Sequence, residues 1–444
     1  MTRFLLGACA LCLALPVHAQ PATRPEQAIS EARLRADIAK LVGFGTRHTL
    51  SSQTDPKRGI GAARTWAEAE FRKTSRACGN CLEIALPETS VSGERVPVPT
   101  RLVDVVAIQR GAERPNEVVI VQGHIDSRGS DVMNATVDAP GANDDGSGTV
   151  LVLEAARVLS QHKFPATIVY AVLSGEEQGL YGGKLLADYA KAQGWTVKAV
   201  FNNDIVGGST GSDGIKDDAH VRVLSEGLRA DSTDTLRAQM RRFGGENDSS
   251  SRNISRWLEG LAAQDGAGLA VRQIWRADRM GRGGDQLPFS DKGYPAVRFS
   301  VAIEDYEHQH QDVRSEGGVK FGDTVDEMDF PYLAKVTRLN VRGLAALASA
   351  PMPPVVTAKA AISTWTDLEW QAVPGAVSYT VWRRRTDAPG WGEKVAEGVT
   401  ATTLRLEHVR GDDWFFGVSA RAASGAESPV ASAVPGGGFG PIGG

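Results

Sequence analysis

The segment at residues 118–148 most strongly limits what this chain can fold into. A short β-branched run at 118–121 predicts a buried strand, and His124 and Asp126 follow it directly. A polar loop then leads to Gly-Ala-Asn-Asp-Asp-Gly-Ser-Gly at 141–148, where an apolar helical pattern begins. Polar side chains at the end of such a strand are typical of the carboxyl edge of an open α/β sheet. On its own, the loop could equally be a turn with a helix N-cap.

The same alternation of apolar runs and helical patterns continues along most of the chain. Strands are predicted at 82–86, 102–109, 118–121, 167–173, 197–201 and 294–301, and helices at 28–42, 60–74, 148–162, 179–193 and 330–350. The polar region 205–280 shows one clear helix, near 232–243. Alternation of this kind predicts an α/β fold with three αβα layers and a mostly parallel mixed sheet, which we place at residues 20–351.

The composition changes after the proline-rich linker at 351–354. Residues 352–435 show short alternating strands with turns, and Tyr379 and Trp382 look buried. This pattern resembles a fibronectin type III module and predicts an all-β sandwich. The glycine-rich tail at 436–444 is expected to be flexible.

The N-terminus and the cysteines indicate an exported protein. Residues 1–19 have one positive charge, a short apolar run and a Val-His-Ala end, which predicts a cleaved signal peptide and an extracytoplasmic location, periplasmic or secreted. No later run approaches the roughly 20 apolar residues of a membrane helix, so no membrane insertion is expected. Export favours a disulfide between Cys78 and Cys81 over thioredoxin-like redox chemistry. The net charge of −4 gives no electrostatic reason to expect a nucleic-acid partner.

Further acids and histidines follow other predicted strands. Glu176 and Glu177 follow the strand at 167–173, Asp204 follows the strand at 197–201, and a late strand leads to His308-Gln-His310. Imidazole and carboxylate together suit zinc. One glutamate of an adjacent pair can bind metal while the other acts as a base, although such a pair can also simply begin a helix.

Taken in order, these motifs resemble those of the di-zinc exopeptidase family that includes leucyl aminopeptidase, aminopeptidase Y and glutamate carboxypeptidase II (metallopeptidase family 28). The resemblance covers roughly residues 29–350. The matching motifs are His124-Ile-Asp126, Asn143-Asp144-Asp145-Gly146, Glu176-Glu177, Asp204 and the late histidine His308.

The resemblance implies a zinc-exopeptidase fold with two Zn²⁺ ions. Asp144 would bridge the ions, and the other metal ligands would be His124 and Asp204 for one ion and Glu177 and His308 for the other. Glu176 would be the general base, and Asp126 would orient His124 through its second ring nitrogen. We assign Asp145 a structural role in the loop.

The late histidine is ambiguous in this sequence. In the family the ligand stands four residues before an aspartate, and the separation from His308 to Asp312 is 312 − 308 = 4. This favours His308, and leaves His310 as a residue of the pocket.

Two positions depart from the family pattern. Gln286 stands where relatives often have a histidine, and Glu307 stands where several have a tyrosine that helps to hold the oxyanion. Tyr306 is one residue earlier, so the identity of the oxyanion donor stays open.

The resemblance implies an exported aminopeptidase that acts on peptides or proteins with a free N-terminus, and a monomer is expected. One alternative is a carboxypeptidase or dipeptidase on the same scaffold. Another is a catalytically inactive binding or adhesion protein, which the fibronectin-like module suggests. The scaffold also resembles glutaminyl cyclases, but those use a single zinc, and the complete two-metal set argues against them.

Overall fold

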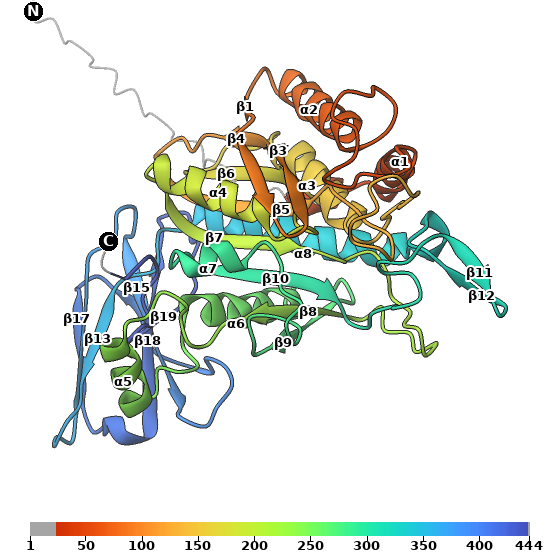
Figure 1. Ribbon diagram of the computed structural model, residues 1–444. Coiled ribbons are helices and arrows are strands. Elements are labelled where there is room, and N and C mark those ends of the chain that lie inside the picture. The colour runs from red at the N-terminus through yellow and green to blue at the C-terminus, as the bar shows by residue number, and fades with distance from the viewer. Residues whose placement is uncertain (1–23, 443–444) are drawn as a thin grey trace, which may run out of the picture.

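A computed structural model describes residues 24–442, so the signal peptide predicted at 1–19 lies outside the described residues. Most of the chain forms a mixed eight-stranded sheet between layers of helices (Figure 1). From one edge to the other, the strands are β1 (Glu83–Ala85), β4 (Val105–Gln109), β6 (Ala166–Leu173), β5 (Arg114–His124), β7 (Thr196–Asn203), β10 (Ala296–Val301), β8 (His220–Ser225) and β9 (Ala270–Ile274). The predicted three-layer α/β fold is confirmed.

The centre of the sheet is parallel. Strand β5 pairs in parallel with β6 and with β7, and β7 pairs in parallel with β10. Strands β4 and β8 join this centre in the antiparallel sense. Because parallel strands end at the same edge, the carboxyl ends of β5, β6 and β7 lie side by side.

Strict alternation along the strands divides the apolar core between the two faces of the sheet. In β5, Val119 and Val121 belong to one buried cluster, whereas Val118 and Ile120 belong to the other. The first cluster lies against α1 (Glu31–Val42), α2 (Ile60–Ala77), α3 (Gly146–Leu159), α6 (Ser250–Ala263) and α8 (Phe330–Ser349), and the second against α4 (Tyr181–Ala192) and α7 (Leu287–Asp291).

The polar region 205–280 contains more regular structure than the sequence predicted. Besides α5 (Asp234–Phe243), which matches the predicted helix, it includes β8, β9 and α6. Helix α6 was missed because it buries polar side chains, including Arg252, Asn253 and Arg256, that hydrogen-bond to neighbouring groups. The helix does have a short apolar stripe, formed by Ile254, Leu258 and Ala262, but the buried polar residues extend its buried face beyond that stripe.

Two hairpins and three short 3-10 helices are further elements of the described residues. The hairpins are β2 (Glu88–Gly93) with β3 (Val96–Val103) and β11 (Arg314–Glu316) with β12 (Val319–Phe321). The 3-10 helices are Pro25–Ala28, Val325–Glu327 and, in the C-terminal unit, Gly411–Asp413. Cys78 and Cys81 form the expected disulfide. Between residues 24 and 442, no helix combines the length and the apolar character that crossing a membrane requires.

The C-terminal residues form two antiparallel sheets that share one apolar core, which confirms the predicted all-β sandwich. One sheet contains β13 (Val356–Lys359), β14 (Thr366–Trp370) and β17 (Thr403–Leu406), and the other contains β16 (Glu393–Val399), β15 (Ser378–Arg385), β18 (Trp414–Arg421) and β19 (Ala431–Ser432). Tyr379 lies in this core, with its ring edge against Trp370. The likeness to a fibronectin type III module stays a prediction.

The sandwich is joined to the α/β unit by a buried ion-pair network around Asp248. The Asp248 carboxylate lies 3.1 Å from Nη1 of Arg256 on α6 and 2.5 Å from Nη2 of Arg384 on β15. The hydroxyl of Ser432 on β19 donates to it at 2.9 Å. All four side chains are buried, so the junction depends on every charge keeping its partner.

The described part of the glycine-rich tail contacts both units, and the flexibility expected for residues 436–444 stays a prediction. Arg229 donates to the carbonyl oxygens of Gly438 and Gly440 at 2.9 and 2.6 Å, and Ile442 donates its N–H to Asp231. Phe439 packs against both the α/β core and the sandwich core. Tertiary contacts of this kind leave no signal in a glycine-rich sequence.

The Asp248→Asn variant should lower the free energy of unfolding by about 3–5 kcal/mol, because it leaves Arg256 and Arg384 buried without their counter-charge. Urea unfolding followed by tryptophan fluorescence measures this. As a control, Asp367→Asn removes the partner of Arg405 on the surface and should leave the midpoint unchanged. A wild-type midpoint for Asp248→Asn would contradict the assigned role of the junction.

Candidate metal centre

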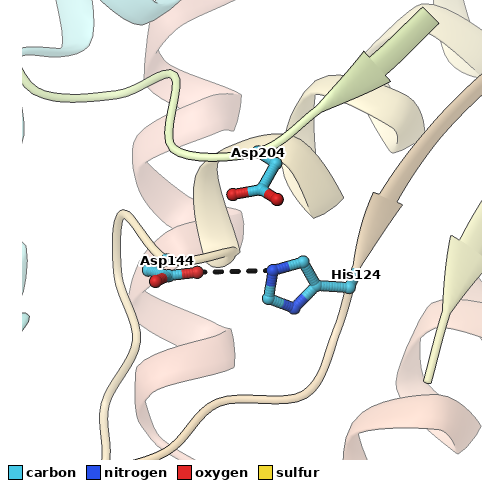
Figure 2. A group of neighbouring side chains, drawn as sticks. All are labelled: His124, Asp144 and Asp204. Carbon is cyan, nitrogen blue, oxygen red and sulfur yellow. Dashed lines mark ion pairs between the residues drawn. The ribbon is translucent and has the colours of Figure 1, made fainter. Parts of the chain in front are cut away.

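Three of the predicted ligands meet where the parallel strands end. His124 is the last residue of β5, Asp204 directly follows β7, and Asp144 lies in the loop before α3. Figure 2 shows the three side chains pointing toward one another, with Nε2 of His124 3.3 Å from Oδ1 of Asp144. Their donor atoms lie within 4.8 Å of one another, close enough to share one cation.

A second group of three donors includes the same aspartate. Nε2 of His310 lies 2.8 Å from Oδ2 of Asp144 and 3.0 Å from Oε1 of Glu177. Asp144 therefore turns one oxygen toward each group. This is the position that a bridging carboxylate between two cations would take.

The structure does not bring His308 into either group, and the choice of His308 as a ligand is corrected to His310. The ring of His308 lies between Asp305, 2.8 Å from Nδ1, and Glu327, 3.4 Å from Nε2. Residues 306–310 form a turn, and the backbone of His310 is left-handed at φ +56°. A spacing count cannot say which of two histidines, separated by one residue in such a turn, faces the site.

The contacts of two later aspartates also explain why the four-residue spacing selected the wrong histidine. Asp312, from which the spacing was counted, accepts the backbone N–H of Ser130 at 3.0 Å. Asp323, beyond the β11–β12 hairpin, accepts the N–H groups of Asn143 and Asp144 at 2.7–3.0 Å and so holds the shared aspartate in place. Sequence reasoning missed Asp323 because the hairpin separates it from the histidines.

Asp126 acts mainly on the turn that carries the two glutamates. Its carboxylate accepts the backbone N–H groups of residues 175–177 at 2.9–3.3 Å and the hydroxyl of Thr49 at 3.1 Å. Its carboxylate is 3.5 Å from Nδ1 of His124, whereas its backbone oxygen is nearer, at 3.1 Å. The predicted orientation of His124 by Asp126 thus comes from the backbone oxygen more than from the side chain.

Asp145 has the structural role that the sequence suggested. It is the N-cap of α3, where it accepts the N–H of Gly148 at 2.9 Å. It also accepts the N–H of His124 at 2.9 Å and of Ile205 at 3.3 Å. One buried carboxylate therefore ties together the chain segments that carry His124, Asp144 and Asp204.

Two arginines that the sequence analysis did not single out each contact one ligand. Arg298, buried on β10, lies 2.5 Å from Oδ1 of Asp204, and Nε of Arg128 donates to Oε2 of Glu177 at 2.9 Å. Each guanidinium occupies one carboxylate oxygen and leaves the other facing the group. A charged residue inside the apolar strand at 294–301 was the available signal for Arg298.

Charge crowding in the centre shifts the acidity of its members. Burial raises the pKa of Glu176 well above its ordinary value, and the carboxylates of Asp204 and Glu177 add to the rise. Burial alone would also raise the pKa of Asp144, but His310 and His124 beside it hold that pKa well below the usual range. A buried carboxyl with a raised pKa among other carboxyl groups is the pattern of a catalytic acid or base.

The donor set fits a divalent cation such as zinc. Among residues 24–442, Nε2 of His124 and Oε1 of Glu177 are buried and make no well-aligned hydrogen bond, although Asp144 and His310 lie 3.3 and 3.0 Å from them. Buried polar atoms are nearly always paired, so one such atom in each group points to a partner of another kind. Imidazole nitrogen and carboxylate oxygen are the ligands that zinc accepts.

Gln286, which departs from the family pattern, and Tyr306, which precedes the other departing position, lie outside these groups. Gln286 is buried, donates to the carbonyl oxygen of Ala277 at 2.8 Å and accepts from Asn202 at 3.3 Å, which is a structural role. Tyr306 is 56% exposed, and its ring lies 5.5 Å from the guanidinium of Arg282. Neither side chain is placed to act in the metal centre.

A cavity of about 400 Å³ opens beside Asp144. Its wall combines apolar side chains, such as Ile205, Ile303 and Met328, with more carboxylates than cations. A concave site next to convergent polar groups is where a substrate would bind.

Comparison with known proteins agrees with this arrangement. The pattern of peptidase family M28 matches residues 104–316. A probable zinc metalloprotease of Leptosphaeria maculans is 40% identical over 92% of this chain and 95% of its own length, and one of Pyricularia oryzae is 40% identical over 92% and 83%.

Solved structures show the same fold at low identity. The LapA aminopeptidase of Legionella pneumophila covers 73% of this chain and 74% of its own at 18% identity (TM-score 0.52), and a glutaminyl cyclase of Fimbriiglobus ruber covers 72% and 95% at 18% (TM-score 0.51). The fold alone therefore does not separate these activities. The long match at 40% identity shows that the chain belongs to peptidase family M28.

Proposed function

We propose that the chain is an exported aminopeptidase that hydrolyses N-terminal peptide bonds with two zinc ions. The observation that carries the proposal is the sharing of Asp144 between two groups of three donors. The printed name of both relatives, probable zinc metalloprotease, supports zinc as the metal. A complete donor set with Glu176 beside it favours an active enzyme over an inactive adhesion protein.

In this proposal each ion has its own ligands and shares one. His124 and Asp204 would hold the first ion, Glu177 and His310 the second, and Asp144 both. When bound, zinc polarises the substrate carbonyl and lowers the pKa of a water molecule toward neutrality.

The chain's own residues then manage the protons. The Glu176 carboxylate accepts a proton from the attacking water as the new C–O bond forms and the C=O pair moves onto the carbonyl oxygen. When the C–N bond breaks, Glu176 returns this proton to the leaving nitrogen. The hydrogen bonds from the backbone of residues 175–177 to Asp126 hold Glu176 in place for both transfers.

The charge of the cavity favours an aminopeptidase over a carboxypeptidase. The carboxylates that line the cavity include Asp305, Glu327 and Asp329. Its arginine and lysine residues are Arg35 and Lys216. An excess of carboxylates attracts the ammonium group of a free N-terminus and repels a C-terminal carboxylate.

A substrate panel with and without chelator tests the proposal. Aminoacyl chromophores with a free amine should be cleaved, their N-blocked counterparts should not, and a chelator should abolish cleavage until zinc is added back. Preference for N-blocked substrates with a free C-terminal carboxylate would assign a carboxypeptidase instead.

The Glu176→Gln variant should bind zinc normally but lose about 10²–10⁴-fold in kcat, because the amide cannot accept the proton. Kinetics on a free-amine substrate, together with zinc content by mass spectrometry, measure both effects. Glu94→Gln, in an exposed turn, is the matched control and should behave as wild type. Near-normal turnover in Glu176→Gln would remove the assigned base.

His310→Ala and His308→Ala separate the two histidines. His310→Ala should reduce bound zinc from about two ions per chain toward about one, because zinc sites depend on their full ligand number. His308→Ala should retain both ions. Zinc titration against a chromophoric chelator measures this, and the opposite pattern would restore His308 as the ligand.

A further inference from the structure

We propose that the side-chain amide of Gln309 donates a hydrogen bond to the oxyanion that forms at the scissile carbonyl. This inference rests on the proposed hydrolytic function and assigns a further catalytic residue to it. Attack on a carbonyl places negative charge on its oxygen, and preorganised N–H donors at that point are among the largest contributions to catalysis.

The position of Gln309 is the first argument. Its Nε2 donates to Oδ2 of Asp144 at 3.2 Å, the same oxygen that lies 2.8 Å from Nε2 of His310. Gln309 also lines the cavity beside Asp144. The amide therefore lies between the Glu177–His310 group and the space that a substrate would enter.

The second argument is that the loop around Gln309 is held in place by its own hydrogen bonds. The backbone N–H of Gln309 donates to the carbonyl oxygen of Asp305 at 3.0 Å. The Asp305 carboxylate in turn accepts the N–H of Glu307 at 3.0 Å and the hydroxyl of Ser212 at 3.1 Å. A donor on such a loop needs little reorganisation when charge develops.

The third argument is that the arginines around the two donor groups are each paired with a carboxylate. Arg128 donates to Glu177 and lies 2.6 Å from Nδ1 of His310, Arg298 is paired with Asp204, and Arg279 donates to Glu304 at 2.8 Å. The side-chain nitrogen of Gln309 carries two N–H groups, and within residues 24–442 only Asp144 accepts from it. One N–H is thus left for a ligand in the cavity.

The role does not change the proton balance of the reaction. The C=O electron pair moves onto the oxygen as water adds, and the Gln309 N–H stabilises that charge without giving up its proton. When the C–N bond breaks, the pair returns to the C=O bond, and Glu176 supplies the proton to the leaving nitrogen. Gln309 acts only while the oxygen carries the extra charge, so its loss should lower kcat more than it raises KM.

The test uses Gln309→Met, which keeps the length of the side chain but removes the N–H groups, and Gln309→Glu, which replaces the donor by an acceptor. Gln311→Met is the control in the same loop; the Gln311 side chain accepts from Arg314 at 3.0 Å and lies outside both donor groups. For each zinc-loaded protein we would measure kcat, KM, zinc content and, by calorimetry, the affinity for a phosphonate analogue of the tetrahedral species.

We expect Gln309→Met to lose about 10²–10³-fold in kcat and to bind the phosphonate more weakly by a similar factor. KM and zinc content should stay close to those of the wild type, and Gln309→Glu should be at least as impaired. Gln311→Met should match the wild type in all four measurements.

Two results would overturn the assignment. Wild-type kcat and phosphonate affinity in Gln309→Met would show that the amide is not a donor. Loss of zinc in that variant would show instead that Gln309 acts by positioning Asp144.

Failure of the proposed function would look different. If the wild type cleaves only N-blocked substrates, the aminopeptidase proposal fails, but the variants still test Gln309 on those substrates, because the same oxyanion forms there. If no tested peptide is cleaved, phosphonate binding alone decides whether the amide recognises a charged oxygen.

Discussion

Mutual repulsion among buried carboxylates is the constraint around which this fold is built. Asp126, Asp144, Asp145, Glu177 and Asp204 crowd one edge of the sheet, and all are buried. Uncompensated, such charges would strongly destabilise the folded chain. Backbone N–H groups compensate Asp126 and Asp145, and arginines compensate Glu177 and Asp204. Asp144 instead has one histidine beside each of its oxygens, His124 and His310, and bound cations would compensate its charge at these two positions.

The sequence was sufficient to predict the sheet and most of the donor residues for one physical reason. Ligands that directly follow apolar strands are placed by the strands themselves, because parallel strands end at a common edge. His124 is the last residue of β5, and Glu177 and Asp204 follow β6 and β7 within a few residues. Their convergence therefore required no knowledge of any loop.

The features that were missed depend on loops or on long-range polar contacts. The choice between His308 and His310 is made by a turn, and the role of Asp323 becomes visible only once the β11–β12 hairpin returns the chain to Asn143. Helix α6 and the packed tail are stabilised by Arg256, which donates to the carbonyl oxygen of Pro389, and by Arg229, which donates to that of Gly440, and both partners are far away in sequence. Apolar periodicity contains no information on such pairs.

The junction at Asp248 has a consequence for how this protein behaves as a whole. In Figure 1 the sandwich lies at the opposite end of the molecule from the β11–β12 hairpin, yet its Arg384 completes a network whose other members belong to the α/β unit. Separating the two units at the proline linker would leave Asp248 without Arg384 and Arg384 without its counter-charge, so we expect neither unit to be stable alone. The sandwich is better described as a fixed part of the α/β unit than as a separable domain. Fused to another enzyme, it would lack the α/β residues that form the other half of the interface.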